Sequence, residues 1–295
     1  MRSSLLAAIL LFAPPPARAG PTVLPAGSAS LYGGVGTSVW SYGMSGNPRD
    51  PAGIARIDTW AGTGIAEHWM ISGGVPLVHS RILVDREGVQ PCPNNEPDYC
   101  RPVTNLGDAH VLVHGGTRWK GIDLRAAAGP RSDIWTAGSR LRYLNVGQGT
   151  VGGLAELAAG AEGADVGGFL EGRYVLRFGR TVEGEDFRAP GDAVQGQLAL
   201  AMSPGPVRVQ LSALGHKQLR GVPFDATYLR THYRTGNRWG VIAFAQVRAE
   251  AKVSVGLSDR TGLHLTASRA VFTIDGPRDH TDVSLGMHLW IPPSG

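Results

Sequence analysis

Apolar and polar residues alternate with a period of two along residues 239–257, "WGVIAFAQVRAEAKVSVGL". Every second residue from Trp239 to Leu257 is apolar, whereas the interleaved positions include Arg248 and Glu250. Successive side chains of a strand point to opposite faces, so the pattern predicts a strand with one apolar and one largely polar face. Strands of soluble proteins are usually about 5–6 residues long. This segment is therefore longer than a globular sheet needs.

The same alternation recurs along most of the chain and predicts twelve strands. The segment 219–238 contains "ATYLRTHYRTGNRWG", which could add two strands and make fourteen. We favour a long hairpin connection there, because a tight turn would interrupt the phase that runs from Trp239 to Leu257, and a one-residue slip exchanges the two faces. The expected strands are 29–44, 53–63, 69–84, 107–116, 121–129, 150–160, 164–179, 192–202, 206–218, 239–258, 262–274 and 281–291.

The segments between these strands are alternately short and long. Tight separators such as "AEGA" (161–164) alternate with longer ones such as 179–192. Bacterial outer-membrane barrels have this arrangement, with an even number of strands, short periplasmic turns and longer external loops. The fold class expected is all-β: an antiparallel transmembrane β-barrel with its apolar face toward lipid. A periplasmic β-sandwich is the alternative, although its core would consist largely of Gly, Ala and Val.

The N-terminal residues have the features of a secretory signal peptide. Arg2 is followed by an apolar stretch from Leu5 to Phe12 and by a small-residue cleavage pattern at 17–19. We expect residues 1–19 to be removed and residues 20–295 to form a single barrel domain. The remaining sequence has no run of about 18 apolar residues, which excludes a helical span. The net charge of +4 and the absence of a basic run give no reason to expect nucleic-acid binding.

Cys92 and Cys100 flank the turn-rich segment "PNNEPDY". Exported proteins form disulfides in oxidising compartments, and the spacing is not that of a Cys-X-X-Cys redox motif. We expect a disulfide that pins the loop 85–106.

The polar face of the strands carries charges of both signs, which predicts cross-strand ion pairs around a narrow aqueous lumen rather than a single-sign ion filter. At about twelve strands, the lumen falls between side-chain-filled eight-stranded barrels and open sixteen-stranded porins. The residues expected to face the lumen are Arg56, Asp58, Asp108, Asp123, Arg125, Glu156, Glu171, Arg173, Arg177, Arg208, Arg248, Glu250, Lys252 and Asp282.

Candidate chemistry is sparse. His79 and Ser80 are adjacent, so in a strand they point to opposite faces and do not form a nucleophile–base pair. His110 and His114 share a strand face with Asp108, but positions two apart lie about 6.6–6.8 Å from each other, which is wide for joint ligation of Zn²⁺. They are weak metal candidates, and the simpler interpretation is histidines hydrogen-bonded within the lumen. We expect no enzyme activity, no catalytic residue and no cofactor.

Several segments resemble a known family. Gly74-Val75-Pro76 through Ser80-Arg81, and Leu106-Gly107-Asp108-Ala109, are similar to early strands of outer-membrane barrels described as transporters of the phenol-degradation meta pathway, with a broader likeness to hydrophobic-compound channels. "GLSDRTGLHLTASRAVF" (256–272) and "DVSLGMHLW" (282–290) resemble the closing strands. The resemblance implies a transporter or channel. The chain departs from the usual terminal aromatic residue, because Trp290 is followed by "IPPSG".

Three functions follow in order of preference. The first is a monomeric channel in the outer membrane of a Gram-negative bacterium that passes a small, hydrophobic or aromatic solute through a polar, mixed-charge lumen. The second is a non-conducting structural or surface-binding barrel. The third, an outer-membrane hydrolase, lacks a recognisable catalytic constellation. The expected partners are outer-membrane lipid, lipopolysaccharide, the barrel assembly machinery and the solute.

Overall fold

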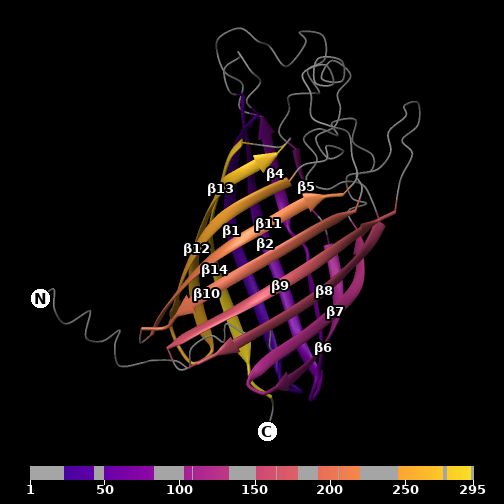
Figure 1. Ribbon diagram of the computed structural model, residues 1–295, viewed down its shortest axis with the longest axis vertical. Helices are drawn as coiled ribbons and strands as arrows, with labels where there is room; N and C mark the ends of the chain where they lie inside the picture. Colours follow the sequence, from indigo (N-terminus) through magenta and orange to yellow (C-terminus); the bar gives the residue numbers. More distant parts are fainter. Residues whose placement is uncertain are drawn as a thin grey trace, which may run out of the picture.

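The computed structural model describes the barrel wall and its short turns (Figure 1). No helix in this part of the chain is long and apolar enough to cross a membrane. The signal-peptide region, Cys92, Cys100 and Asp108 lie outside the described residues, so the predictions made for them stay predictions. The described ranges are 23–42, 50–82, 103–107, 109–132, 151–163, 165–178, 192–204, 206–219, 245–274 and 278–293.

Fourteen strand segments form one antiparallel sheet. They are β1 (Ala29–Tyr42), β2 (Asp50–Ala66), β3 (Trp69–Gly74), β4 (Leu77–Ile82), β5 (Val103–Leu106), β6 (Ala109–Trp119), β7 (Ile122–Ser132), β8 (Val151–Glu162), β9 (Val166–Arg177), β10 (Ala193–Met202), β11 (Val207–Gln218), β12 (Ala245–Gly256), β13 (Thr261–Ile274) and β14 (Arg278–Ile291).

Two of the barrel's strands are each interrupted once. β3 and β4 both pair with β2, and they continue one another across Val75-Pro76. β5 pairs with β4 and β6 pairs with β3, so β5 and β6 likewise form one strand. Pro76 has no N–H to donate to a ladder, and its carbonyl accepts from Gly107 N–H at 2.7 Å. Fourteen segments therefore make twelve strands around the wall.

The barrel closes because β1 pairs with both β14 and β2. Ala29 lies opposite Ile291 on one side and opposite Thr63 on the other. Closure leaves no unpaired strand edge, and a closed barrel can satisfy every backbone group within lipid. The start of β1 and the end of β14 lie at the end of the barrel that carries the short turns, here called the turn end (Figure 1). The opposite end is called the loop end.

The strand count and the all-β class agree with the sequence prediction. β11 pairs directly with β12 from Val207↔Val255 to Lys217↔Ala245, so segment 219–238 adds no strand to the wall between them. The twelve-strand interpretation is confirmed and the fourteen-strand one is wrong. The strand expected from Trp239 is described from Ala245 onward; residues 239–244 lie outside the described part.

The hairpin between β6 and β7 shows how the turn end is built. Trp119 and Ile122 are paired, and the two residues between them, Lys120 and Gly121, have φ of 50° and 84°. A two-residue loop with positive φ at both positions matches the right-handed twist of the flanking strands. Gly121 adopts this conformation at little steric cost. The Lys120 ammonium lies 4.8 Å from the Trp119 ring centroid.

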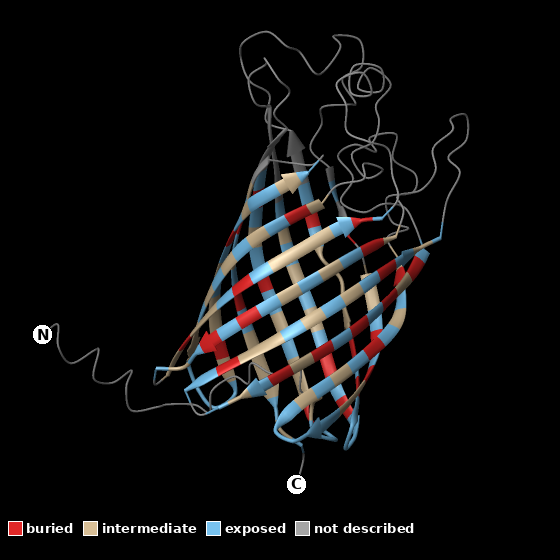
Figure 2. Ribbon diagram, viewed as in Figure 1, coloured by how far each residue is buried: buried red, intermediate tan, exposed pale blue. Residues whose placement is uncertain are grey.

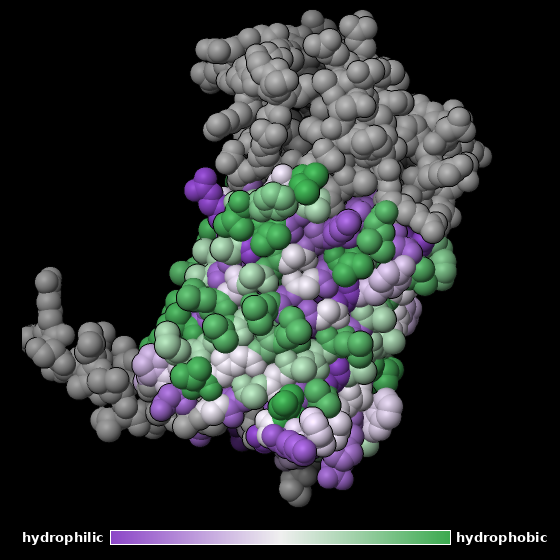
Figure 3. Space-filling view, in the orientation of Figure 1, coloured by the Kyte–Doolittle hydropathy of each residue, from purple (hydrophilic) through white to green (hydrophobic). Residues whose placement is uncertain are grey.

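The wall has the opposite polarity to a soluble sandwich. Burial alternates along each strand (Figure 2), and large apolar side chains stand on the outer surface, as on the face in Figure 3. The exposed fractions of Leu157, Leu200 and Val271 are 69%, 65% and 64%. Trp69 and Trp119 are exposed near the turn end, as expected of an interfacial aromatic girdle.

Candidate functional site: the barrel lumen

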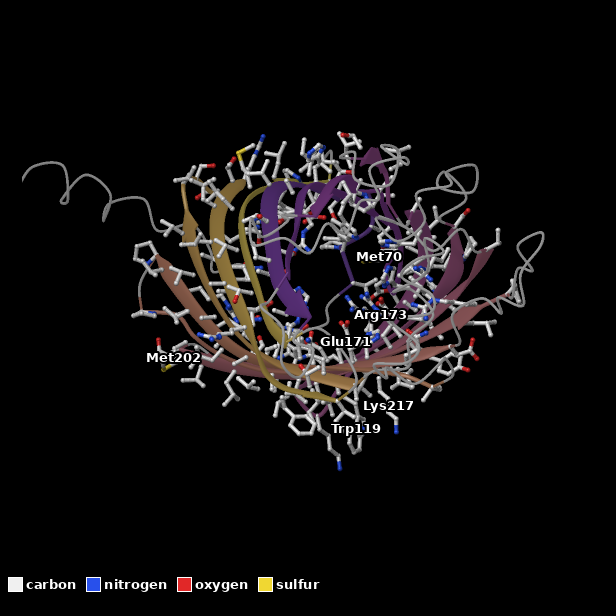
Figure 4. The ribbon with its side chains drawn as sticks, turned by 90° about the horizontal axis from the view of Figure 1, so that it is seen from above. Met70, Trp119, Glu171, Arg173, Met202 and Lys217 are labelled. Carbon is white, nitrogen blue, oxygen red and sulfur yellow. The ribbon has the colours of Figure 1, made fainter. Side chains whose placement is uncertain are left out.

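The polar face of the wall points into the barrel. On β9, Glu171 and Arg173 are partly buried and point into the bore, whereas Leu170 and Tyr174 on the alternate positions are exposed (Figure 4). Met202, Trp119 and Lys217 project outward in the same view. The residues of the predicted lumen set that occupy inward positions are Arg56, Asp58, Asp123, Arg125, Glu156, Glu171, Arg173, Arg177, Arg208, Arg248, Glu250, Lys252 and Asp282.

Four of these residues form a charge cluster on β7, β8 and β9, here called the four-residue cluster. Glu156 and Arg173 are opposite one another in the β8–β9 register, with Arg173 Nη2 2.6 Å from Glu156 Oε1. Arg125 Nη2 lies 2.9 Å from Glu171 Oε2 and 3.7 Å from Glu156 Oε2. Each carboxylate thus contacts both guanidinium groups, since Arg173 is also 3.6 Å from Glu171. The two positive and two negative charges neutralise one another.

A second cluster surrounds Asp282 on β14, across the bore from β8. Arg248 Nη1 contacts Asp282 Oδ2, and the hydroxyl of Ser268 donates to the same oxygen at 3.1 Å. His280 Nε2 lies 3.1 Å from Asp282 Oδ1, and its Nδ1 lies 3.1 Å from Gln246 Oε1. The set links β12, β13 and β14 near the barrel's closing seam.

Further ion pairs lie elsewhere in the lumen. Arg208 Nη1 is 2.9 Å from Glu162 Oε1 near the turn end, and Arg208 also contacts the hydroxyl of Ser203. On β2, Arg56 Nε lies 2.8 Å from Asp58 Oδ2, in a pair whose side chains are 35% and 29% exposed. Charges of both signs therefore pair across and along the strands.

A cavity of about 320 Å³ opens between the two clusters. Glu171 and Arg173 form one side and Arg248 and His280 the other. Leu214 contributes the one apolar side chain among its described lining residues. The full lining consists of Glu171, Arg173, Gln195, Gly196, Gln197, Leu214, Gly215, His216, Gln246, Arg248 and His280.

Most of these lining residues are uncharged and are absent from the predicted set, which contained charged residues alone. Gln195, Gln197 and Gln246 lie at the same inward alternate positions as their charged neighbours, so the period-two pattern carried the signal that would have found them. Arg131 was missed for another reason. The sequence placed residues 129–149 in a loop, whereas β7 continues to Ser132 and buries Arg131.

His114 occupies an inward, buried position, and its Nε2 shares a hydrogen bond of 2.7 Å with the hydroxyl of Ser72. His110 lies two inward positions away on the same strand. Among the residues described, no group of three or more His, Cys, Asp or Glu side chains could hold a metal ion. Asp108, the third member of the weak metal candidate, lies outside that set. His79 is on the outer face, with its Nδ1 2.7 Å from the Thr104 hydroxyl.

The inner surface also carries an apolar band that the sequence pattern did not indicate. Five neighbouring strands contribute one residue each, and none of the five side chains is more than 8% exposed. The band lies on the loop-end side of Glu156, because Leu154 is two residues nearer that end of β8. Its members are Leu112, Ala127, Leu154, Val175 and Ala193.

Residues 23–28 enter the turn end of the barrel. Gly27 N–H donates to Gly64 O at 2.9 Å, and Gly64 N–H donates to Ser28 O at 3.0 Å. The side chain of Val23 lies over Gly116, where a Cβ would collide with it. Leu24 N–H points at Met70 Sδ at 3.4 Å. This stretch, here called the N-terminal segment, fills part of the bore beside β2, β3 and β6.

A closed, twelve-stranded antiparallel barrel with apolar residues outside and charged clusters inside is the fold of outer-membrane β-barrels. No family model matches the chain, and no curated protein is similar to it in sequence, so the particular phenol-pathway family is not confirmed. The solved structures that share the fold include the following two. An outer membrane channel from Pseudomonas putida F1 matches with a TM-score of 0.65 and 10% identity, over 93% of this chain and 99% of that one. The NanC porin matches with a TM-score of 0.51 and 7% identity, over 88% and 98%.

Proposed function

We propose that the protein spans the bacterial outer membrane and allows a small hydrophilic solute to diffuse through its lumen. The observation that carries this proposal is the cavity between the two charge clusters, enclosed by a wall that is apolar outside and polar inside. Similar structures include an outer membrane channel and a porin.

The outer surface supports the membrane assignment. Leu157 and Leu200 are more than 60% exposed on the wall, and transferring each such side chain from water to an apolar medium is worth about 1.5–3 kcal/mol. Summed over the exposed apolar side chains, this makes a lipid environment much more favourable than water. We expect the turn end to face the periplasm, because outer-membrane barrels have short turns on that side.

The lining favours a hydrophilic rather than a hydrophobic or aromatic solute. Gln195, Gln197 and Gln246 present amides to the cavity, whereas Leu214 is the apolar side chain among them. The amides of Gln195 and Gln197 already have partners in the wall, His216 and Ser212. Each amide can make further hydrogen bonds, so a solute with hydroxyl groups gains bonds at this lining that an apolar solute does not.

A second candidate function is a non-conducting barrel that binds lipopolysaccharide or another surface partner. The observation that favours it is the filling of the bore, by the buried band that includes Leu112 and Leu154 and by the N-terminal segment. In this case the lumen would serve as a packed core.

Single-channel recording in planar bilayers separates the two. Purified protein, inserted at low concentration, is expected to give discrete conductance steps of uniform size. Protein unfolded by boiling before insertion is the control and should give none. If folded protein inserts, as shown by protease protection in liposomes, and no steps occur at any voltage, the channel proposal is wrong and the scaffold function remains.

A further inference from the structure

The ion pairs beside the cavity are arranged asymmetrically. The side chain of Arg173 is 37% exposed, whereas that of its partner Glu156 is 4% exposed. Across the cavity, Arg248 is 27% exposed and its partner Asp282 is 10% exposed. The guanidinium groups thus line the cavity, while Glu156 and Asp282 lie behind them in the wall.

One carboxylate offsets this cationic lining. Glu171 faces the cavity at 18% exposure, but it also lies 2.9 Å from Arg125. The lining therefore presents two guanidinium groups and one carboxylate. The main partners of the two guanidinium groups, Glu156 and Asp282, lie back in the wall. A charge that lines the cavity lies closer to a solute than a charge set back in the wall, and therefore acts on it more strongly. The cavity therefore attracts anions more strongly than the net charge of the clusters suggests.

The remaining lining is suited to hydroxyl groups. Side-chain amides both donate and accept hydrogen bonds, and three of them, Gln195, Gln197 and Gln246, converge on the cavity. The rings of His216 and His280 complete the lining on the adjoining strands, and both ring nitrogens of His280 are already held by Asp282 and Gln246. A cavity of about 320 Å³ is at the small end of ligand pockets, about 300–1,000 Å³. This size fits one molecule similar to a monosaccharide.

We propose that this cavity is a binding site for a small hydroxylated organic monocarboxylate. The carboxylate lies between the guanidinium groups of Arg173 and Arg248, and the hydroxyl groups bond to the amides of β10 and β12. Planar guanidinium groups bind carboxylates through charge-assisted hydrogen bonds of about twice the neutral strength. The inference deepens the proposed function by naming the solute class, and it rests on that function for the solute's route to the site.

Equilibrium binding by isothermal titration calorimetry tests the site in detergent-solubilised, folded protein. Glucuronate is the probe and glucose its uncharged counterpart of nearly equal size. We expect glucuronate to bind about tenfold or more tightly than glucose, because the charged hydrogen bonds are lost with the carboxylate. Equal binding of the two would mean an uncharged-polyol site and would overturn the proposal.

A paired substitution separates exposed charge from total charge. Glu156→Gln with Arg173→Gln removes one cavity-facing cation and one buried anion, leaving the net charge unchanged. We expect glucuronate affinity to fall about tenfold while glucose binding stays the same. If this variant does not fold, Arg248→Gln with Asp282→Asn makes the same change on the other side. Lys217→Gln is the matched control, because Lys217 projects outward (Figure 4) and its loss should leave affinity within about twofold.

The outcomes distinguish this inference from the proposed function. Protein that conducts in bilayers but binds neither probe disproves the anion site and leaves the channel. Protein that binds glucuronate selectively without conducting keeps the site and removes the channel. A paired variant that binds glucuronate as tightly as the natural sequence shows that the guanidinium groups do not form the site.

Discussion

The ring of Tyr32 lies against the backbone of Gly286 across the β1–β14 pair. A Cβ built on Gly286 would be 2.5 Å from the Tyr32 Cε2 atom and 2.8 Å from Cζ. Glycine therefore gives the ring the space it occupies on the inner wall. The ring continues into a stack with His264 at 5.5 Å, and His264 stacks on His288 at 5.8 Å. This aromatic stack spans β1, β13 and β14, the strands that close the barrel.

Replacing this glycine should weaken the closing seam. Gly286→Ala is expected to lower the free energy of unfolding by about 1–3 kcal/mol, because the added methyl group forces the Tyr32 ring from its place. Urea unfolding of the protein in lipid vesicles, followed by tryptophan fluorescence, measures the change.

Gly33→Ala is the control for that substitution. Gly33 is adjacent to Tyr32 but faces outward, and nothing lies within 4 Å of a Cβ there. It should change stability by less than about 0.5 kcal/mol. Equal losses of unfolding free energy for the two variants would show that strand propensity, and not the contact with Tyr32, governs these positions.

The buried carboxylate of Glu156 in the four-residue cluster should contribute far more to stability than the partly exposed carboxylate of Asp58. Glu156→Gln leaves Arg173 and Arg125 with Glu171 as their remaining carboxylate partner in the cluster, so we expect a loss of about 3 kcal/mol in unfolding free energy. Asp58→Asn breaks the half-exposed Arg56 pair and should cost less than about 1 kcal/mol. The same urea measurement compares the two variants. If both lost the same free energy of unfolding, burial of the carboxylate would not determine how much an ion pair contributes to stability.

The sequence predicted the wall well because a strand has a period of two whatever its neighbours are. The register of Glu156 opposite Arg173 could not be predicted, since it depends on which residues meet across β8 and β9. The apolar band through Leu112 and Leu154 was missed for a related reason. Those residues occupy the inner face, where the alternation rule leads one to expect polar side chains.

The cavity was not foreseeable either. Its lining combines residues from β9, β10, β11, β12 and β14. The exposed fractions of Arg173 and Glu156 are also set by the fold, and neither follows from composition or spacing. The N-terminal segment was missed because residues before the first strand carry no alternation. Its contacts also require that Gly64 and Gly116, on the inner wall, have no side chain.

The N-terminal segment should limit conductance if the barrel is a channel. Deleting Val23–Pro25 removes the side chain over Gly116 and the contact with Met70, so unitary conductance should rise in planar bilayers. Gly116→Val should displace the segment and act in the same direction.

Gly172→Ala is the control, because Gly172 faces outward with nothing within 4 Å of a Cβ. It should leave conductance unchanged. If deletion of Val23–Pro25 also leaves conductance unchanged, the segment does not obstruct the path that ions follow.

Backbone strain can be separated from steric contact at the β6–β7 turn. Gly121 has φ of 84° and nothing within 4 Å of a Cβ, so Gly121→Ala adds strain without a collision. We expect a loss of about 1 kcal/mol in unfolding free energy. Lys120→Asn should raise the free energy of unfolding by a few tenths of a kcal/mol, because Asn tolerates the left-handed conformation better than Lys. This gain is net of the lost contact between Lys120 and the Trp119 ring. Urea unfolding in vesicles resolves the first change. If Gly121→Ala were neutral, the turn must relax to negative φ without cost, and the tight hairpin would not be what aligns β6 with β7.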